Sequence, residues 1–368
     1  MAENAQLLVA TANRMFKGFA DETMRKRIWL AMAEARGNIE FNAPGPQYYW
    51  DVMYSEPGMR QYGDGGDLEF ANHEAYKQLN TDIRGYELTD KITEKQHLLN
   101  QGELQIVDMM GQKVENLKNS ARRKFGRELY VDGNASGNEN RFHGIESFMG
   151  AGSCAAGDRV AKCSDTYAGL STVQGNYGGS WSTDLASGDR PNSTLANDWP
   201  NGSGSAEYDF MSPKLINYSS TAWPSGLTTW RDNCFDVLTN MSVWCRNTNG
   251  EDGAPLLCLM GSTLFTQFKE ALNAKSRIVL PHAASQDLGF EDALDYEGTS
   301  IKWESDCPAN VAYGLLMDQF EISFATSKMF QSRGPEYDIK SNAYLMLLYT
   351  FGNIRWRPKH FAKIAAVA

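Results

Sequence analysis

The chain has 368 residues, of which 42% are apolar and 11% aromatic, so it is long enough and apolar enough to bury a sizeable core. Its formal net charge of −10 argues against a dedicated nucleic-acid-binding module, because such modules usually present a basic face. We expect a globular protein whose contact with DNA, if it makes one, is local and weak.

The N-terminal region predicts helices and carries no targeting signal. The first 14 residues lack the basic start and apolar stretch of a signal peptide, and no run of about 18 apolar residues exists anywhere. We therefore expect no membrane partner and a protein that stays, at first, in the cytoplasm. Apolar side chains at spacings of three and four predict one or two amphipathic helices in residues 4–36, either as an arm on a neighbouring surface or as a plain first helix.

Residues 38–90 change to short extended pieces separated by turn signals such as Pro44-Gly45-Pro46. Between Leu79 and Leu88 apolar and polar residues alternate, which predicts a strand that is polar on at least one side. Together these features predict a long two-stranded ribbon. A lone ribbon is only marginally stable in water, so it should rest on another surface, which in an oligomer could be the next subunit.

The clearest predicted element is one long helix over residues 93–130, because apolar residues step by three and four for many turns. At about 1.5 Å per residue it would span about 50 Å. Gly102 and Gly111 inside it predict a bend or a close neighbour. Cations near its far end either complement the negative helix terminus or form a positive strip that faces DNA. These cations are Lys118, Arg122, Arg123, Lys124 and Arg127.

A polar break at 131–141 is followed, up to about Trp230, by a stretch rich in Gly, Ser, Thr, Asn and aromatic residues, which predicts loops and short strands. After a loop at 247–255, we predict a strand at 256–260 and a helix that Ser262 caps and that ends near Lys275. Further strands are predicted at 278–280, 299–303, 314–317, 320–324 and 343–356. The fold class is therefore α+β.

The chain contains residues of the types that bind metals or catalyse reactions, but their spacings match no known metal-binding or catalytic motif. Asp132-x-Asn134-x-Ser136-Gly137 imitates the start of a calcium loop, yet the twelfth position is His143 where a bidentate Glu is needed. The six cysteines never stand at C-x-x-C spacing, which predicts free thiols, and the five histidines form no ligand pair. Phosphate-loop, dinucleotide and nucleophile-elbow motifs are absent. We expect no catalytic, cofactor-binding or metal-binding residues and no cofactor.

The tryptophans leave one alternative open. Aromatic rings that line a cleft together with two carboxylates could bind or cleave a glycan, although nothing marks which two acids would act. Aromatic residues in a strand-rich region more often anchor a core or an interface. The tryptophans in question are Trp181, Trp199, Trp223, Trp230 and Trp244.

Several stretches of the sequence resemble segments of one protein family, and they occur in the same order as in that family. They include GYELTDKITEKQHLL (85–99) and the residues that follow it to 149, CSDTYAGLSTVQGNYGGSW (163–181), LMGSTLFTQFKEAL (259–272), residues 295–325 and IRWRPKHFAKI (354–364). With an arm, a ribbon, a long helix, a loop-rich middle and a returning strand, the chain resembles the tailed-phage major capsid proteins, whose fold recurs in encapsulins.

The resemblance implies a phage major capsid fold with four parts. Residues 1–40 would form an N-terminal arm, 41–90 an extended β-ribbon loop, 91–139 with 321–356 a peripheral domain on a spine helix, and 140–320 with 357–368 a loop-rich axial domain. No sequence motif fixes the partners of the covalent Lys–Asn cross-link that some members form. No sizeable extension precedes the arm, which implies a separate scaffolding protein.

The implied function is structural and not enzymatic. Copies would form the pentamers and hexamers of an icosahedral shell around double-stranded DNA, and neighbours would stabilise each thin subunit. Scaffolding, portal and decoration proteins would be further partners, and the protein would pass from the host cytoplasm into the virion. The alternatives are an encapsulin-like compartment for enzyme cargo and the glycan-binding protein.

Overall fold

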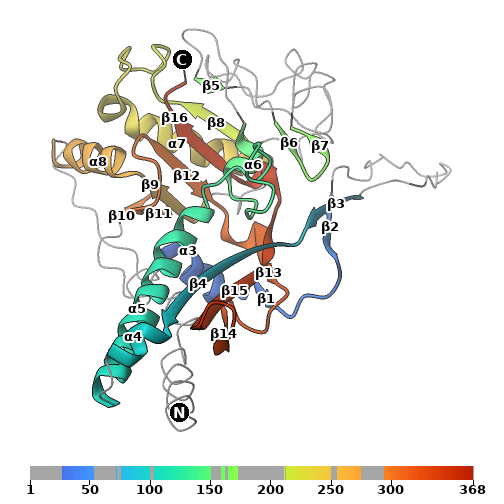
Figure 1. The fold of residues 1–368 in the computed structure, drawn as a ribbon. Coiled ribbons are helices and arrows are strands. Elements are labelled where there is room, and N and C mark those ends of the chain that lie inside the picture. The colour runs from blue at the N-terminus through green and yellow to red at the C-terminus, as the bar shows by residue number, and fades with distance from the viewer. Residues whose placement is uncertain are drawn as a thin grey trace. The chain divides into compact units, whose positions relative to one another are not determined.

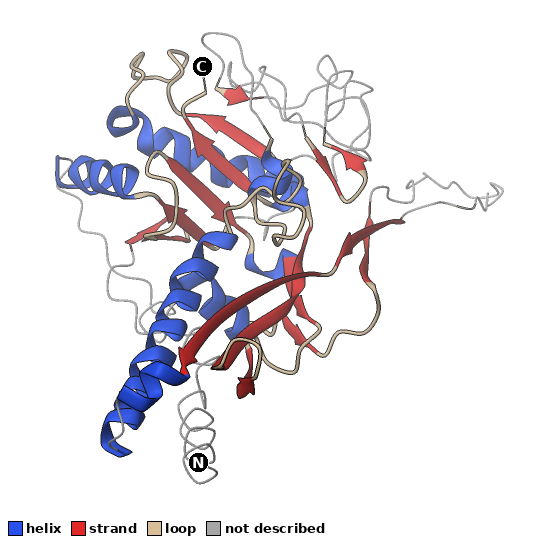
Figure 2. Ribbon diagram, viewed as in Figure 1, coloured by secondary structure: helices blue, strands red, loops and turns tan. Residues whose placement is uncertain are grey.

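The structure is a computed structural model, and it describes residues 27–53, 72, 76–99, 103–150, 159–161, 165–172, 211, 213–249, 255–274 and 294–367. The chain divides into two compact units (Figure 1). Unit 1 comprises Met1–Tyr48, Asp82–Gly144 and Glu321–Arg355, and unit 2 comprises Tyr49–Thr81, Ile145–Phe320 and Trp356–Ala368. Both units contain helices and strands (Figure 2), which confirms the predicted α+β class.

Unit 1 is built on a five-stranded sheet with the long strand β15 (Ala343–Trp356) at its centre. Two strands, β4 (Arg84–Thr93) and β14 (Gln331–Asp338), pair antiparallel with β15. Both pair with the same first half of β15, so they lie on its two opposite edges. The strand β13 (Phe320–Phe324) also pairs with β15, and β1 (Ile39–Phe41) runs parallel to β13. The strand prediction for 343–356 is confirmed at both ends.

Helices pack on unit 1's sheet through the apolar face that the sequence predicts. α5 (Glu103–Glu128) lies beside β4, and its residues Val114, Leu117, Ala121 and Phe125 are buried at spacings of three and four (Figure 1). Phe125 stacks on Trp29 of α3 (Ile28–Ala35), with 6.4 Å between ring centroids. α4 (Glu94–Leu99) precedes α5.

The helix predictions are confirmed where the structure describes them. α3 confirms the end of the segment predicted at 4–36, whose earlier part lies outside the described residues. The single helix predicted over 93–130 corresponds to α4 and α5, and their connection at 100–102 also lies outside the described residues. Gly111 lies inside α5.

The two-stranded ribbon exists, but only the first part of the strand predicted from Leu79 to Leu88 belongs to it. β2 (Gln47–Met53) and β3 (Tyr76–Asp82) form the ribbon, whereas the strand predicted from Leu79 to Leu88 is divided at Ile83. Its second part is β4, which leaves the ribbon and joins β15. Local alternation marked an extended chain, but it could not say that the strand changes partner, because β15 is about 260 residues away in sequence.

One face of the ribbon is buried against its own chain. Trp50 is 9% exposed and Leu79 is fully buried, and the indole N–H of Trp50 donates a hydrogen bond to the backbone carbonyl of Trp356 at 3.2 Å. The supporting surface for this part of the ribbon is therefore within the subunit. Tyr49 and Tyr76, in contrast, are 50% and 65% exposed.

Unit 2 is built on a seven-stranded sheet against which two helices pack. In spatial order the strands are β10 (Leu294–Tyr296), β11 (Thr299–Trp303), β9 (Leu257–Met260), β12 (Val311–Leu315), β16 (Ala362–Ala365), β8 (Lys214–Asn217) and β5 (Val160–Ala161). The helices α7 (Trp230–Asn249) and α8 (Ser262–Ala274) supply much of the core, which includes Trp230, Trp244 and Phe268. Smaller elements are α6 (Glu146–Met149), β6 (Thr166–Tyr167), β7 (Leu170–Ser171), η3 (Met317–Gln319) and η4 (Pro358–His360).

Two further strand predictions are confirmed at their bounds. They are the strand of unit 2 predicted at 299–303 and the strand of unit 1 predicted at 320–324. The strand predicted at 314–317 is wrong in its bounds, because β12 ends at Leu315 and the chain turns into η3 at Met317. The strand predicted at 278–280 lies outside the described residues.

Ser262 is the first residue of α8 and not its cap, contrary to the prediction. The backbone carbonyl of Gly261 accepts the N–H of Phe265 at 3.0 Å, which places Gly261 at the capping position. A Cβ at Gly261 would lie 2.0 Å from the carbonyl oxygen of Pro308. Backbone packing therefore demands glycine where the sequence rule looks for a serine.

Candidate functional site

The predicted cationic strip at the end of α5 is smaller than the sequence suggests. Lys118 is only 8% exposed, and Arg122 is half-buried, with its backbone carbonyl accepting a hydrogen bond from Arg27 at 3.0 Å. Arg123, Lys124 and Arg127 are exposed. Only these three of the five predicted cations are fully exposed to solvent.

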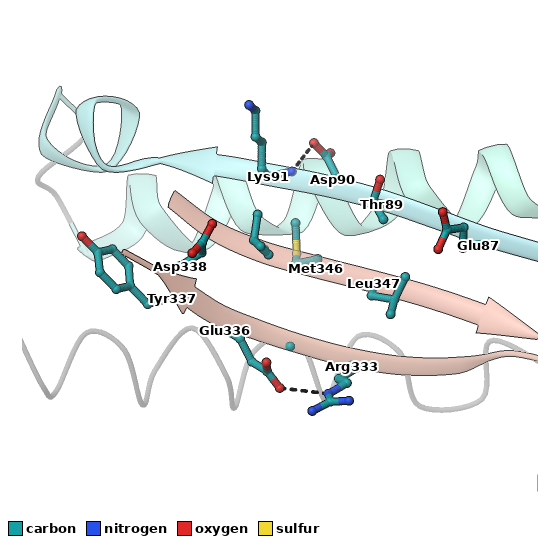
Figure 3. A pocket seen from close by; sticks show the side chains of 12 residues that line it. Glu87, Thr89, Asp90, Lys91, Arg333, Glu336, Tyr337, Asp338, Met346 and Leu347 are labelled. Carbon is teal, nitrogen blue, oxygen red and sulfur yellow. Dashed lines mark hydrogen bonds and ion pairs between the residues drawn. The ribbon is translucent and has the colours of Figure 1, made fainter. Parts of the chain in front are cut away.

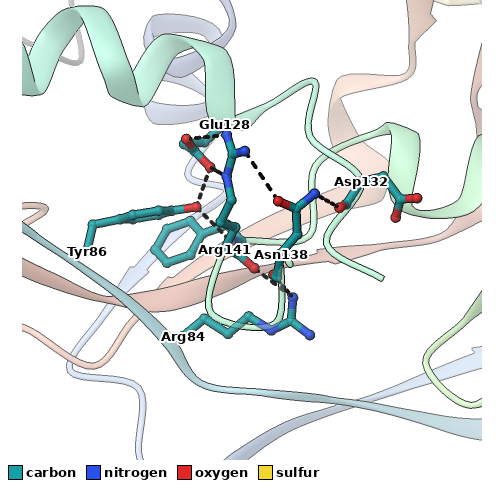
Figure 4. Close-up of polar contacts among 7 residues, drawn as sticks. Arg84, Tyr86, Glu128, Asp132, Asn138 and Arg141 are labelled. Carbon is teal, nitrogen blue, oxygen red and sulfur yellow. Dashed lines mark hydrogen bonds and ion pairs between the residues drawn. The ribbon is translucent and has the colours of Figure 1, made fainter. Parts of the chain in front are cut away.

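Beside this strip, a group of polar side chains that we call the loop cluster joins the end of α5 to β4 (Figure 4). The carboxylate of Glu128 accepts hydrogen bonds from Arg141 at 2.8 and 3.1 Å and also one from the hydroxyl of Tyr86. The Tyr86 oxygen accepts the backbone N–H of Phe142 at 2.6 Å. Arg84 Nη1 donates to the backbone carbonyls of Gly133 and Arg141, both at 2.7 Å.

The electrostatics of the loop cluster fix its protonation. Burial, and then the neighbouring charge of Glu128, raise the pKa of the Tyr86 hydroxyl far above its usual value, so the hydroxyl keeps its proton. The hydrogen bond to Glu128 raises the pKa of Arg141, which stays charged. Because these donors and acceptors satisfy one another, the cluster holds the 131–141 loop in place, a structural task.

A second feature of unit 1 is a solvent-exposed sheet face. Leu345, Leu347, Tyr349 and Phe351 alternate with the buried residues of β15 and form an apolar row; Leu345 is 39% and Phe351 46% exposed. Polar residues flank this row. In register they are Lys91, Thr89 and Glu87 on β4, and Arg333 and Gln331 on β14.

We call this apolar row with its flanking residues the open sheet face. It is hollowed into a groove of about 800 Å³, which Figure 3 shows with Glu87 and Thr89 of β4 on one side and Arg333 and Glu336 of β14 on the other. A neighbouring hollow of about 670 Å³ reaches Phe351. The sequence could not reveal this face, because β15 is apolar on both of its sides.

The chemical sites that the sequence made conceivable are structural in this fold. Asp132 Oδ1 accepts the backbone N–H of Asn134 at 2.8 Å, which is an ordinary Asx turn. In the part of the chain that the structure describes, no three His, Cys, Asp or Glu side chains gather as metal ligands. None of the described helices has the length and apolar character of a membrane span.

The tryptophans with described positions do not line a cleft. Trp223, Trp230 and Trp244 are each at most 2% exposed, and the indole N–H groups of Trp223 and Trp230 donate to backbone carbonyls at 2.8 and 2.9 Å. They anchor the core of unit 2, as aromatic residues in such regions usually do. Trp181 and Trp199 lie outside the described residues.

The described cysteines, and the histidines His143 and His360, are also buried or largely buried in the structure. Cys234, Cys245, Cys258 and Cys307 are buried thiols outside any disulfide, and burial raises the pKa of Cys245 to about 11 and that of Cys258 to about 12, so these two thiols keep their protons near pH 7. Burial lowers the pKa of His143 to about 4 and that of His360 to about 2, so both are neutral near pH 7.

Comparisons with known proteins give matches only at the level of structure. No protein-family model and no curated protein matches the sequence. The capsid asymmetric unit of Cyanophage A-1(L) matches with a TM-score of 0.55 and 13% identity, over 90% of this chain and 90% of that chain. The capsid of Myoviridae Phage XM1 matches with a TM-score of 0.49 and 11% identity, over 91% of each chain. The mature capsid asymmetric unit of bacteriophage PhiM1 matches with a TM-score of 0.48 and 10% identity, over 90% of this chain and 86% of that chain.

The likeness to the cyanophage capsid chain extends over 90% of both chains, so it concerns the whole architecture and not one shared motif. It agrees with the resemblance read from the order of arm, ribbon, helix and returning strand. The chain has the fold of the tailed-phage capsid proteins.

Proposed function

We propose that this chain is a major capsid protein that assembles with itself into the icosahedral head shell of a tailed phage, which encloses double-stranded DNA. The observation that carries the proposal is the capsid fold over 90% of the chain. The role is structural and not enzymatic, and the protein belongs to the virion after assembly in the host cytoplasm. Scaffolding, portal and decoration proteins are its proposed partners.

The exposed apolar surface supports assembly. Tyr49 and Tyr76 on the ribbon are 50% and 65% exposed, and the open sheet face presents a further apolar row. Monomeric proteins rarely leave such contiguous patches in water, whereas subunits of an oligomer bury them against neighbours. The residues of the shell contacts are therefore expected among these two surfaces.

The proposal assigns a task to each part of the chain. Residues 91–139 and 321–356 would form the peripheral domain, with α5 as its spine helix, and residues 140–320 and 357–368 the axial domain. Residues 1–40 would be the arm and 41–90 the extended loop. Pentamers and hexamers of such subunits would make the shell.

Contact with DNA should be weak and limited to the exposed end of α5. Each phosphate that a cation neutralises contributes about −0.9 to the slope of log K against log salt, so the three exposed cations predict a slope no steeper than about −3. The double variant Arg123→Glu/Lys124→Glu should lose about two units of that slope. Fluorescence anisotropy of labelled duplex DNA over a salt series measures both values.

A matched control places the same charge change on α7, with Arg231→Glu and Arg246→Glu, two exposed residues of unit 2. This control should leave the slope unchanged. A slope near −6 in the unchanged protein, or an equal loss in both double variants, would contradict the proposed contact.

Assembly itself is tested by negative-stain electron microscopy and sedimentation of the purified chain, alone and with a candidate scaffolding protein. Rings, tubes or closed shells are expected in at least one sample. A stable small species under both conditions, combined with saturable sugar binding, would contradict the shell function and support the glycan-binding alternative. Closed shells that enclose enzyme cargo instead of DNA would indicate an encapsulin-like compartment.

A further inference from the structure

The strand β4 of unit 1 has one free edge. It pairs with β15 over its whole length without a register shift, and β15 is its only strand partner in the described parts of the chain. Prolines and bulges are two of the means by which proteins protect such an edge, and β4 contains neither. The inference below concerns this edge and the hollow beside it, and it does not depend on the proposed shell function.

The backbone groups at the free edge belong to every second residue of β4. A Cβ at Gly334 of β14 would touch the carbonyl oxygen of Leu345, so this carbonyl points to β14 and away from β4. The pair Leu345–Lys91 is therefore one of those without mutual hydrogen bonds. In agreement, the Lys91 N–H donates to Asp90 Oδ1 at 2.7 Å, and the Lys91 carbonyl accepts a hydrogen bond from Lys113 Nζ at 3.3 Å.

Two residues of β4 leave their backbone groups open to a partner. Thr89 and Glu87 lie two and four residues before Lys91, so their N–H and C=O groups also point away from β15. Both residues are exposed, and in the described ranges no protein group bonds these backbone atoms. Figure 3 shows Glu87, Thr89 and Lys91 along the strand. The edge thus offers two donors and two acceptors that bond to water in the free chain.

A hollow of about 300 Å³ adjoins this edge, between β4 and α5. Its floor is apolar, because Ala121, Phe125 and Phe330 are buried there and Leu88 of β4 also lines it. The volume lies at the lower limit of ligand pockets, so the hollow suits one bulky side chain better than a whole drug-sized molecule.

The rim of the hollow carries an excess of positive charge. Lys124 and Arg127 are exposed and lie three residues apart on α5, which places them on one face of the helix, about 5–6 Å apart. Of the two carboxylates that line the hollow, Glu128 is already paired with Arg141 at 2.8 Å, so only Glu87 opposes these two cations. The rim therefore favours a segment that brings carboxylates.

We propose that the free edge of β4 docks an extended segment of a partner protein, which adds a strand to the sheet of unit 1. The segment carries a bulky apolar residue with a carboxylate two positions to either side. Its backbone bonds Glu87 and Thr89, its apolar side chain fills the hollow, and its carboxylates meet Lys124 and Arg127.

This pattern of residues follows from strand geometry. Side chains two positions apart on a strand point to the same face and lie about 7 Å apart, which matches a pocket with cations beside it. In strand addition, backbone hydrogen bonds supply affinity, and pockets for alternate side chains supply specificity.

The probe is a fluorescein-labelled peptide with the core Glu-Thr-Leu-Thr-Glu, whose symmetric pattern fits either strand direction. Fluorescence anisotropy with the unassembled full-length chain should show saturable binding. Hydrogen exchange should slow about tenfold or more at the amides of Glu87 and Thr89. The amides of Tyr86 and Leu88, which point to β15, should not change. A ligand that only filled the hollow would leave the edge amides in water.

Two variants separate the edge from the rim. Thr89→Pro removes an N–H that faces solvent and no bond to β15, so the fold should persist by circular dichroism while peptide binding weakens about tenfold. Lys124→Glu/Arg127→Glu should weaken binding by a similar factor. The control Arg231→Glu/Arg246→Glu on α7 should leave binding unchanged.

If Thr89→Pro does not fold, modified probes replace it. One peptide is N-methylated at its Leu and the other at both Thr residues, so each loses the N–H groups of one strand edge. Because an added strand bonds β4 through alternate residues only, one of these peptides should bind normally and the other about tenfold more weakly.

Strand docking is overturned if the peptide binds without slowing exchange at Glu87 and Thr89, or if both N-methylated peptides bind equally well. Absence of saturable binding up to about 1 mM overturns it too. An equal loss of binding in the α5 and α7 charge variants would reject the role of the rim. All measurements use unassembled chain, so failure to form shells would not alter their meaning.

Discussion

Val114→Pro is expected to destabilise the protein by about 3 kcal/mol or more and to abolish shell formation. Val114 is fully buried in the middle of α5. Proline there removes a helical N–H donor and places its ring against the carbonyl four residues earlier, which breaks the helix. Urea unfolding followed by circular dichroism measures the loss, and electron microscopy measures assembly.

Val114→Ala is the control for the lost side chain. It keeps the helical backbone and removes two methyl groups, so it should cost about 2 kcal/mol and still allow shells to form. Shells that assemble normally from Val114→Pro would contradict the proposed role of α5 as the spine helix of the peripheral domain.

Acid is expected to destabilise the protein through His143. Its pKa is lowered to about 4, because burial and Arg84 disfavour the charged ring, whereas the unfolded chain has a value near 6.5. Between these values the unfolded state binds the proton and the native state does not, so stability is complete above about pH 6.5 and falls as the pH drops towards 4. The loss from this residue is about 3 kcal/mol.

The contribution of His143 is isolated by comparison with His143→Gln. Urea unfolding at half-unit steps from pH 7.5 to 4 should give a steeper fall of the unfolding free energy for the unchanged protein than for the variant. His360, whose pKa is lowered to about 2, changes stability in the same direction and remains in both proteins. Equal slopes would show that His143 is not buried as a neutral ring.

The missed helix α7 shows where local propensity fails. Its sequence is rich in Asn, Thr, Cys and Trp, which are mediocre helix formers, so no helix was predicted there. The signal that was available is periodicity, since Phe235, Leu238, Met241 and Cys245 are buried at steps of three and four. Packing against the sheet of unit 2 supplies the stability that propensity lacks.

The loop cluster could not have been found from the sequence. Its members are single polar residues, such as Arg84, Glu128 and Arg141, separated by up to 57 positions and flanked by no motif. Polar residues of this kind are usually solvent-exposed, so nothing local distinguishes those that the topology buries together. The predicted cations at the end of α5 could be named, but the sequence did not tell which of them are buried.

The sequence by itself determined the α+β class, the apolar face of α5, the strands at 299–303, 320–324 and 343–356, and the order of parts that resembles the capsid fold. These features depend on periodicity and on neighbours close in the chain. Only the tertiary structure decided that β4 leaves the ribbon to pair with β15, that one side of β15 stays open, and that Glu128 meets both Tyr86 and Arg141. The physical reason is that these are pairings between residues far apart in sequence, and their free energy appears only when the whole fold brings them together.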